Sequence, residues 1–220
     1  MKTSIYLSHP ISNDTPLYGG ANAINISQAS SVQKGDTANT LNLSFPNHSG
    51  THIDVPYHFF EDGKKLTDYD ASFWTFHNPV CVDVSGKDGY LVRYDDVGDS
   101  INKDTDLLLI RTGYEKYRSE RKYWEKNPGL SSDLAKGLKE NHPRIRAVGV
   151  DTISITSQLH RDDGRKAHRI FLSSFYGSDE IVLIEDMSLN NYSNTISKII
   201  ISPLLIKNAD GAPSTVFGFL

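Results

Sequence analysis

The most informative stretch of the sequence covers residues 48–59 and reads His48-Ser49-Gly50-Thr51-His52-Ile53-Asp54-Val55-Pro56-Tyr57-His58-Phe59. Gly50 and Pro56 interrupt this stretch, so it cannot form one continuous helix. His48 and His52 are four residues apart and Asp54 follows two later, so a single turn could aim all three side chains at one cation. The stretch therefore predicts a metal site, of the kind found in metal-dependent hydrolases.

The residue types in this stretch suit a divalent metal that activates water. Such a metal takes neutral imidazole nitrogens and ionised carboxylates at about 2.0–2.2 Å. His48, His52 and Asp54 supply two nitrogens and one carboxylate and leave positions for a water, which becomes a nucleophile near neutral pH. Asp54 has two oxygens and could also bridge to a second metal. His58 lies too far along the chain to share the same turn, and its place beside the metal suits a general acid/base.

A second metal would need ligands from elsewhere in the chain. Glu185 ends the apolar run 181–184, and a carboxylate at the end of a buried strand is costly unless it is paired or bound to a metal. His168 lies in a segment with a helical pattern and is the preferred partner of Glu185. His160 is the alternative.

Composition indicates one globular domain covering residues 1–220. Hydrophobic residues make up 38% and charged residues 23% of the chain, which argues against disorder. A net charge of −4 gives no general attraction to nucleic acid or to an anionic membrane surface. The single cysteine, Cys81, excludes an internal disulfide and a cysteine-rich zinc site, and its strand-like surroundings predict a buried thiol.

Apolar runs are too short for a secretory signal or a membrane span. The longest apolar patch, residues 199–206, is broken by Ser202 and Pro203. We therefore expect a soluble, cytoplasmic protein that acts on a small molecule.

The pattern of elements predicts a mixed α/β fold. Residues 40–46 alternate apolar and polar side chains, which predicts a half-buried strand leading directly into His48. Other strands are expected at 3–8, 80–84, 107–110, 147–150, 181–184 and 199–201. Helices are expected at 114–126, from about 131 to 141, and from about 163 to 173.

The sequence resembles a known family, the cyclase superfamily that includes bacterial kynurenine formamidases and isatin hydrolases. The family signature is His-x-Gly-Thr-His-x-Asp-x-Pro-x-His, and residues 48–58 match every fixed position. The resemblance runs along the whole chain, through Leu7-Ser8-His9-Pro10-Ile11, Tyr18-Gly19-Gly20, Leu109-Ile110-Arg111-Thr112-Gly113, Pro128-Gly129-Leu130-Ser131, Val148-Gly149-Val150-Asp151, Ala167-His168-Arg169 and Ile184-Glu185.

The resemblance implies both a fold and a site. The fold would be a swivelling β/β/α type with a mixed, barrel-like sheet and flanking helices, in an assembly of two or more copies. Two ions, zinc or manganese, would be bound by His48, His52, Asp54, His168 and Glu185, with Asp54 as the bridge. His58 would be the proton-transfer residue and Tyr18 would contact the substrate. The reaction would be hydrolysis of an arylformamide, amide or lactam, or of a related ester or lactone.

The chain departs from the family in two places. The segment between His168 and Glu185 is about five residues longer than usual, owing to residues 173–178. Tyr18 stands where the formamidases carry tryptophan, which weakens the case for N-formylkynurenine as the substrate.

Two other classes of function are compatible with the motif. His48, His52 and Asp54 could form the two-histidine, one-carboxylate triad of a mononuclear iron oxygenase, which would not require Glu185. A non-catalytic metal-binding member of the fold is the other, but it would have no use for His58. A serine hydrolase is disfavoured because the sequence has no Gly-x-Ser-x-Gly elbow.

Overall fold

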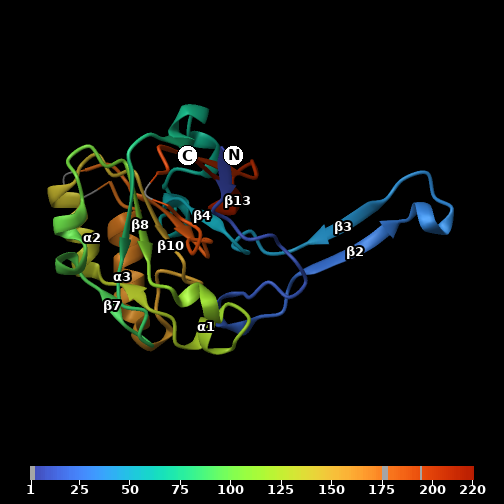
Figure 1. Ribbon diagram of the computed structural model, residues 1–220, viewed down its shortest axis with the longest axis horizontal. Coiled ribbons are helices and arrows are strands. Elements are labelled where there is room, and N and C mark those ends of the chain that lie inside the picture. Colours follow the sequence, from blue (N-terminus) through green and yellow to red (C-terminus); the bar gives the residue numbers. More distant parts are fainter. Residues whose placement is uncertain (1–2, 175–177, 194) are drawn as a thin grey trace.

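The strand inside the histidine-rich stretch, β4 (His52–Asp54), lies in the middle of a nine-stranded sheet (Figure 1). The computed structural model describes residues 3–174, 178–193 and 195–220. The other strands of this sheet are β1 (Ser4–Tyr6), β5 (Thr75–Phe76), β6 (Pro79–Asp83), β8 (Leu107–Arg111), β10 (Ala147–Val150), β11 (Val182–Glu185), β12 (Lys198–Pro203) and β13 (Gly211–Phe219). The mixed α/β class predicted from the sequence is thereby confirmed.

β4 is the junction between two halves of the sheet. On one side, β11, β10, β8 and β6 run parallel to one another in that order. On the other side, β13, β12 and β5 are antiparallel, and β1 pairs with β13. β4 is antiparallel to both of its neighbours, β11 and β13. Its side chains therefore lie where the two halves of the fold meet.

The sheet separates two apolar cores, because alternate residues of a strand face opposite sides. Ile53, Leu109 and Ile184 belong to the core on one face. Leu108 and Leu183 belong to the core on the other face, which α2 (Ser132–Asn141) and α3 (Arg161–Phe171) cover. Both helices appear close to the predicted positions, and α2 begins where the Ser131 hydroxyl accepts a hydrogen bond from the Leu134 amide.

The helix predicted over residues 114–126 is largely wrong. The segment contains a short 3-10 turn at Tyr114–Tyr117 and one helical turn, α1 (Lys122–Glu125). The segment folds around Tyr114, whose hydroxyl lies 3.0 Å from the Lys126 carbonyl oxygen, 3.0 Å from Asp88 Oδ1 and 3.4 Å from the Lys122 carbonyl oxygen. A packed turn around one buried tyrosine thus replaces the continuous amphipathic helix.

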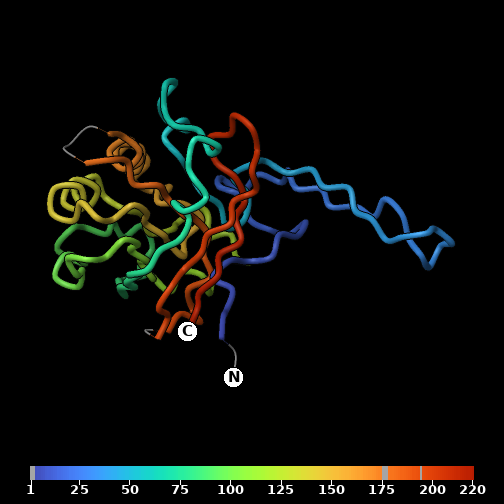
Figure 2. Tube along the Cα trace, turned by 90° about the horizontal axis from the view of Figure 1, so that it is seen from above, coloured from blue at the N-terminus to red at the C-terminus, as the bar shows by residue number. Residues whose placement is uncertain are grey.

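The predicted burial of residues 40–46 is also wrong. Among the residues that the structure describes, β3 (Thr40–Ser44) pairs only with β2 (Asn25–Ser30), a strand not expected from the sequence. Every residue of β3 is exposed. Figures 1 and 2 show this hairpin projecting far from the body of the protein. Leu41 is 61% and Leu43 is 59% exposed. A second small sheet, β7 (Leu91–Val92) with β9 (Gly129–Leu130), lies within the body.

Three further expectations concern single features. The Cys81 thiol is half-buried, and burial raises its pKa to about 12, so it stays protonated. Within the described ranges, no helix is both long and apolar enough to cross a membrane. The longer segment at residues 173–178 includes residues 175–177, which lie outside the described part of the chain.

Candidate metal centre

The strand geometry of β4, rather than a helical turn, brings the motif side chains together. His52 and Asp54 are two residues apart on the strand and therefore point to the same face, while Ile53 between them enters a core. On the neighbouring strand, Glu185 lies directly opposite His52 in the β4–β11 register. α3 adds His168 from above this face. The single turn inferred from the sequence spacing is thus corrected to a strand.

Two glycines allow His48 to join this group from the preceding loop. Gly50 has a φ of 62°, a left-handed conformation that turns the chain and directs its carbonyl oxygen at His52. At Gly211, a Cβ atom would lie 2.3 Å from the carbonyl oxygen of Ile53 and 2.8 Å from Cε1 of His48. A side chain at position 211 would therefore push His48 out of place.

The distances between the imidazole nitrogens and the carboxylate oxygens match those of ligands around a metal. His52 Nε2 is 3.5 Å from Asp54 and 3.4 Å from Glu185. His168 Nε2 is 3.6 Å from Asp54 and 3.3 Å from Glu185. Two ligands bound tetrahedrally at about 2.1 Å lie about 3.4 Å apart, longer than an ordinary hydrogen bond. This spacing leaves room for an ion between the atoms.

Each imidazole also has a partner on its second nitrogen. His52 Nδ1 donates to the Gly50 carbonyl oxygen at 2.8 Å, and His168 Nδ1 to the Gly164 carbonyl oxygen at 3.0 Å. A carbonyl oxygen only accepts, so Nδ1 carries the proton in both residues and Nε2 offers a lone pair to the cluster. Metal-binding histidines are held in the same way, by an acceptor on the nitrogen remote from the metal.

The charges of the cluster also call for a cation. In the described part of the chain, the ion pairs of Asp54 and Glu185 are all with histidines. Burial opposes charge on His168, but Asp54 and Glu185 outweigh burial and raise its pKa to about 10. Burial and Asp54 disfavour the charge of Glu185, but His168 and His52 more than offset them and hold its pKa at about 2. The buried carboxylates thus draw protons onto the imidazoles unless another cation is bound.

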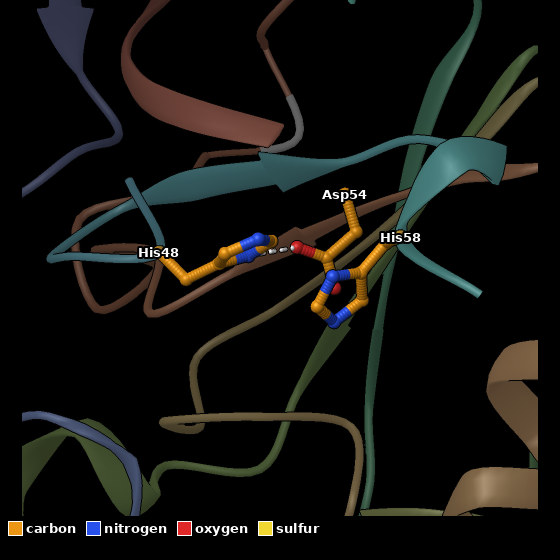
Figure 3. Close-up of side chains that lie close together, drawn as sticks. All are labelled: His48, Asp54 and His58. Carbon is orange, nitrogen blue, oxygen red and sulfur yellow. Dashed lines mark hydrogen bonds and ion pairs between the residues drawn. The ribbon is translucent and has the colours of Figure 1, made fainter. Parts of the chain in front are cut away.

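His58 lies beside this cluster, at the mouth of the site, and is exposed. It follows β4 in a 3-10 turn, Pro56–His58. The rings of His48 and His58 have centroids 4.2 Å apart, and Figure 3 shows His48 facing Asp54 with the His58 ring beside them. His48 Nδ1 is 2.8 Å from Asp54 Oδ1.

Asp210 is a residue of the site that sequence reasoning missed. Its Oδ2 accepts from His48 Nε2 at 2.9 Å and from His58 Nδ1 at 2.7 Å, while Asn47 donates to Oδ1 at 2.6 Å. Both nitrogens of His48 thus face carboxylate oxygens, which only accept, so the ring carries a proton on each. Burial opposes this charge, but Asp54 and Asp210 outweigh burial and raise the pKa of His48 to about 10. A metal bound at Nδ1 would take the place of that proton. His58 must carry its proton on Nδ1, which leaves Nε2 free as a base. Asp210 directly precedes β13, and its Asp-Gly context is that of an ordinary turn, so no local signal in the sequence singled it out.

A cavity of about 330 Å³ opens onto the cluster, a size that suits a small molecule. Its apolar wall includes Leu17, Phe59 and Ile153, and Tyr18 lines it from the 3-10 turn Tyr18–Gly20. All five predicted metal-ligand residues and His58 line or adjoin this one cavity. His160, the alternative ligand, is exposed and lines a separate surface hollow, so the structure does not bring it into the cluster.

Fold and side chains together define an α/β protein with three imidazoles and two carboxylates clustered at the centre of a mixed sheet, a donor set typical of divalent-metal sites. The family model described as "Putative cyclase" matches residues 5–157, and the chain belongs to this family. The matched range includes residues 48–58 and ends before His168.

Relatives align over almost the entire chain. The kynurenine formamidase of Bacillus anthracis is 29% identical over 215 residues, covering 97% of this chain and 96% of that protein. The kynurenine formamidase of Bacillus mycoides is 28% identical over 215 residues, with the same coverage.

Solved structures share the fold. Isatin hydrolase A from Labrenzia aggregata, bound to benzyl benzoate, has a TM-score of 0.82 at 22% identity, covering 99% of this chain and 93% of that one. A predicted metal-dependent hydrolase from Bacillus stearothermophilus has a TM-score of 0.74 at 19% identity, covering 98% of this chain and 97% of that one. The barrel-like mixed sheet expected from the family resemblance is thereby confirmed.

Proposed function

We propose that this protein is a metal-dependent hydrolase of carbon–nitrogen bonds in small amide-type substrates, such as arylformamides and lactams. One observation carries the proposal: two imidazoles, His52 and His168, each direct Nε2 at both Asp54 and Glu185 with spacings of 3.3–3.6 Å. The names of the relatives, kynurenine formamidase and isatin hydrolase, agree with this class of reaction. We propose that the whole chain acts as one catalytic domain.

The ligands divide naturally between two ions. Asp54 Oδ1 faces His48 and His52, whereas Asp54 Oδ2 faces His168. Glu185 Oε1 lies 3.3 Å from His168. One divalent ion would be held by His48, His52 and Asp54, and a second by His168, Glu185 and Asp54, with Glu185 also 3.4 Å from His52. Imidazole and carboxylate ligands suit both zinc and manganese.

A bound divalent ion would supply a water of lowered pKa and polarise the substrate carbonyl. His58 takes a proton from the attacking water on its free Nε2 and later donates it to the leaving nitrogen. Asp210 accepts a hydrogen bond from His58 Nδ1 and so holds His58 in the required tautomer. Tyr18, with Leu17 and Ile153 nearby in the cavity wall, would contact the rest of the substrate.

We further propose that the protein acts as a homo-oligomer of two or more copies in the cytoplasm. The β2–β3 hairpin is a separate two-stranded sheet whose Leu41 and Leu43 face solvent. Apolar side chains on a projecting hairpin suit burial against a second copy.

Replacing His58 tests the mechanism. We expect H58A to lose a factor of about 10²–10⁴ in kcat, because general acid–base catalysis contributes that much. Metal content, measured by mass spectrometry, should stay at the wild-type level, since His58 is not assigned as a ligand. Substrates would be a panel of aryl formamides, isatin-like lactams and lactones.

The matched control is H77A, because His77 is an exposed histidine outside the cavity. H77A should keep wild-type turnover. Full activity in H58A would remove His58 from the mechanism. Turnover that stops without oxygen, with one iron per chain, would favour the oxygenase instead.

A further inference from the structure

Two arginines lie on the wall of the catalytic cavity opposite the sheet. Arg161 and Arg165 line the cavity from α3, the helix that also carries His168. These residues are at positions i, i+4 and i+7, which share one face of a helix. At a rise of 1.5 Å per residue, Arg165 and Arg161 lie roughly 4.5 and 10.5 Å along the helix from His168. Arg165 is therefore the nearer and Arg161 the more distant of the two from His168 along the helix that forms this wall.

Both guanidinium groups also act on Tyr18, across the cavity. Burial raises the pKa of the Tyr18 hydroxyl, and the positive charges of Arg161 and Arg165 oppose that rise. Tyr18 lines the same cavity as both arginines, and its hydroxyl adds a hydrogen-bond donor to that wall.

The charged side chains that this part of α3 presents to the cavity are cationic. In the described part of the chain, the ion pair of Arg165 is with Asp162 at 3.9 Å, and the Asp162 side chain is exposed. Asp163 lies beside the start of α2, where it accepts from the amide and the hydroxyl of Ser132. Both aspartates keep their charge, but neither lines the cavity, whereas both arginines do. The arginines therefore offer positive charge and hydrogen-bond donors to an anionic group, and the planar guanidinium matches the geometry of a carboxylate.

We propose that Arg161 and Arg165, with the Tyr18 hydroxyl, form a binding site for a carboxylate carried by the substrate. This inference rests on the proposed hydrolase function and specifies its substrate class. The amide carbonyl lies at the metal cluster, an apolar ring or short chain lies against Leu17 and Ile153, and the carboxylate lies at the arginines. An acid-bearing aryl formamide fits this order of groups better than a neutral lactam.

Matched substrates test the proposal directly. The formamidobenzoates with the two groups at positions 2, 3 and 4 are each compared with the corresponding neutral formamidobenzamide. We expect the best carboxylate isomer to exceed its carboxamide at least tenfold in kcat/KM, and the R161Q/R165Q variant to bring this ratio close to one. K166Q is the matched control, because Lys166 is exposed on the same helix but does not line the cavity. It should keep the wild-type ratio.

The outcomes separate this proposal from the hydrolase function. Hydrolysis of carboxylate and carboxamide at equal kcat/KM would overturn the carboxylate site and leave the hydrolase function intact. If neither compound is hydrolysed, calorimetric titration of benzoate and benzamide into the metal-loaded protein decides. Benzoate binding that weakens about tenfold or more in R161Q/R165Q, but not in K166Q, supports the site. Unchanged benzoate binding in R161Q/R165Q would mean that the metal ions hold the carboxylate, and would overturn it.

Discussion

β3 and β4 are neighbours in the sequence but lie in opposite environments. β3 is exposed along its length on the projecting hairpin, whereas β4 is buried at the centre of the sheet (Figure 1). Yet β3 has the regular apolar alternation of a half-buried strand, and β4 consists of Ile53 between a histidine and an aspartate. The strand with the more hydrophobic pattern is therefore the exposed one.

The difference shows that burial depends on partners rather than on hydrophobicity alone. β4 tolerates burial because its polar atoms are paired: His52 donates to the Gly50 carbonyl oxygen, and Asp54 lies among imidazoles. The apolar alternation of β3 indicates a face that becomes buried against another surface. It does not indicate whether that surface belongs to the same chain or to a second copy.

The largest effect, on catalytic activity, is expected when Asp54 of β4 is replaced. D54N should lose at least about a thousandfold in kcat/KM, because the neutral amide cannot bridge two cations. Metal content should fall in parallel, measured by mass spectrometry. The matched control is D36N in the turn of the hairpin, where Asp36 is exposed, and it should stay within about twofold of wild type. An active, metal-loaded D54N would contradict the assigned bridge.

The apolar residue of β4 gives the next largest effect, on stability. Ile53 is completely buried in the core, so I53A should lower the free energy of unfolding by about 2–5 kcal/mol. I53V removes one methylene and should cost only about 0.5–1.5 kcal/mol. Urea unfolding followed by fluorescence measures both. Equal, small losses in the two variants would show that this part of β4 is loosely packed.

A smaller effect on kcat is expected at Asp210, in the loop before β13. D210N keeps the shape of Asp210 but removes its negative charge. If the amide oxygen accepts from His48 and His58, the amide nitrogen faces the Asn47 donor. We expect kcat to fall about 10–100-fold, as is usual when the partner of a metal-binding histidine is lost. A purely structural role would instead change the unfolding midpoint and leave kcat per folded, metal-loaded molecule unchanged.

Much of the site follows from the sequence, because it depends on local spacing and on the cost of burying charge. The ligand-type residues His52 and Asp54 lie close together in the chain, and Glu185 ends an apolar run, so both features can be read without the fold. The turn predicted for the motif is instead a strand. The structure brings these residues together with His48 and His168, as predicted.

Features that depend on long-range pairing were not predicted. Asp210 belongs to the site only through contacts 152 and 162 residues away in the chain, and its Asp-Gly context reads as an ordinary turn. β13 was missed because Gly211, Pro213 and Gly218 are unfavourable in strands. It forms because β1, β4 and β12 all pair with it.

The smallest effect on the stability of the protomer is expected in the β2–β3 hairpin. Leu41 and Leu43 are exposed within their own chain, so L41S/L43S should change the free energy of unfolding of the isolated protomer by less than about 0.5 kcal/mol. Its effect should appear in assembly: sedimentation velocity should find an oligomer for wild type and mostly monomer for the variant. Because Trp74 and Trp124 lie in the body, their fluorescence can follow protomer unfolding at concentrations where both proteins are monomeric. A loss as large as that of I53A would mean that the hairpin packs against its own body, and the contrast between β3 and β4 would fail.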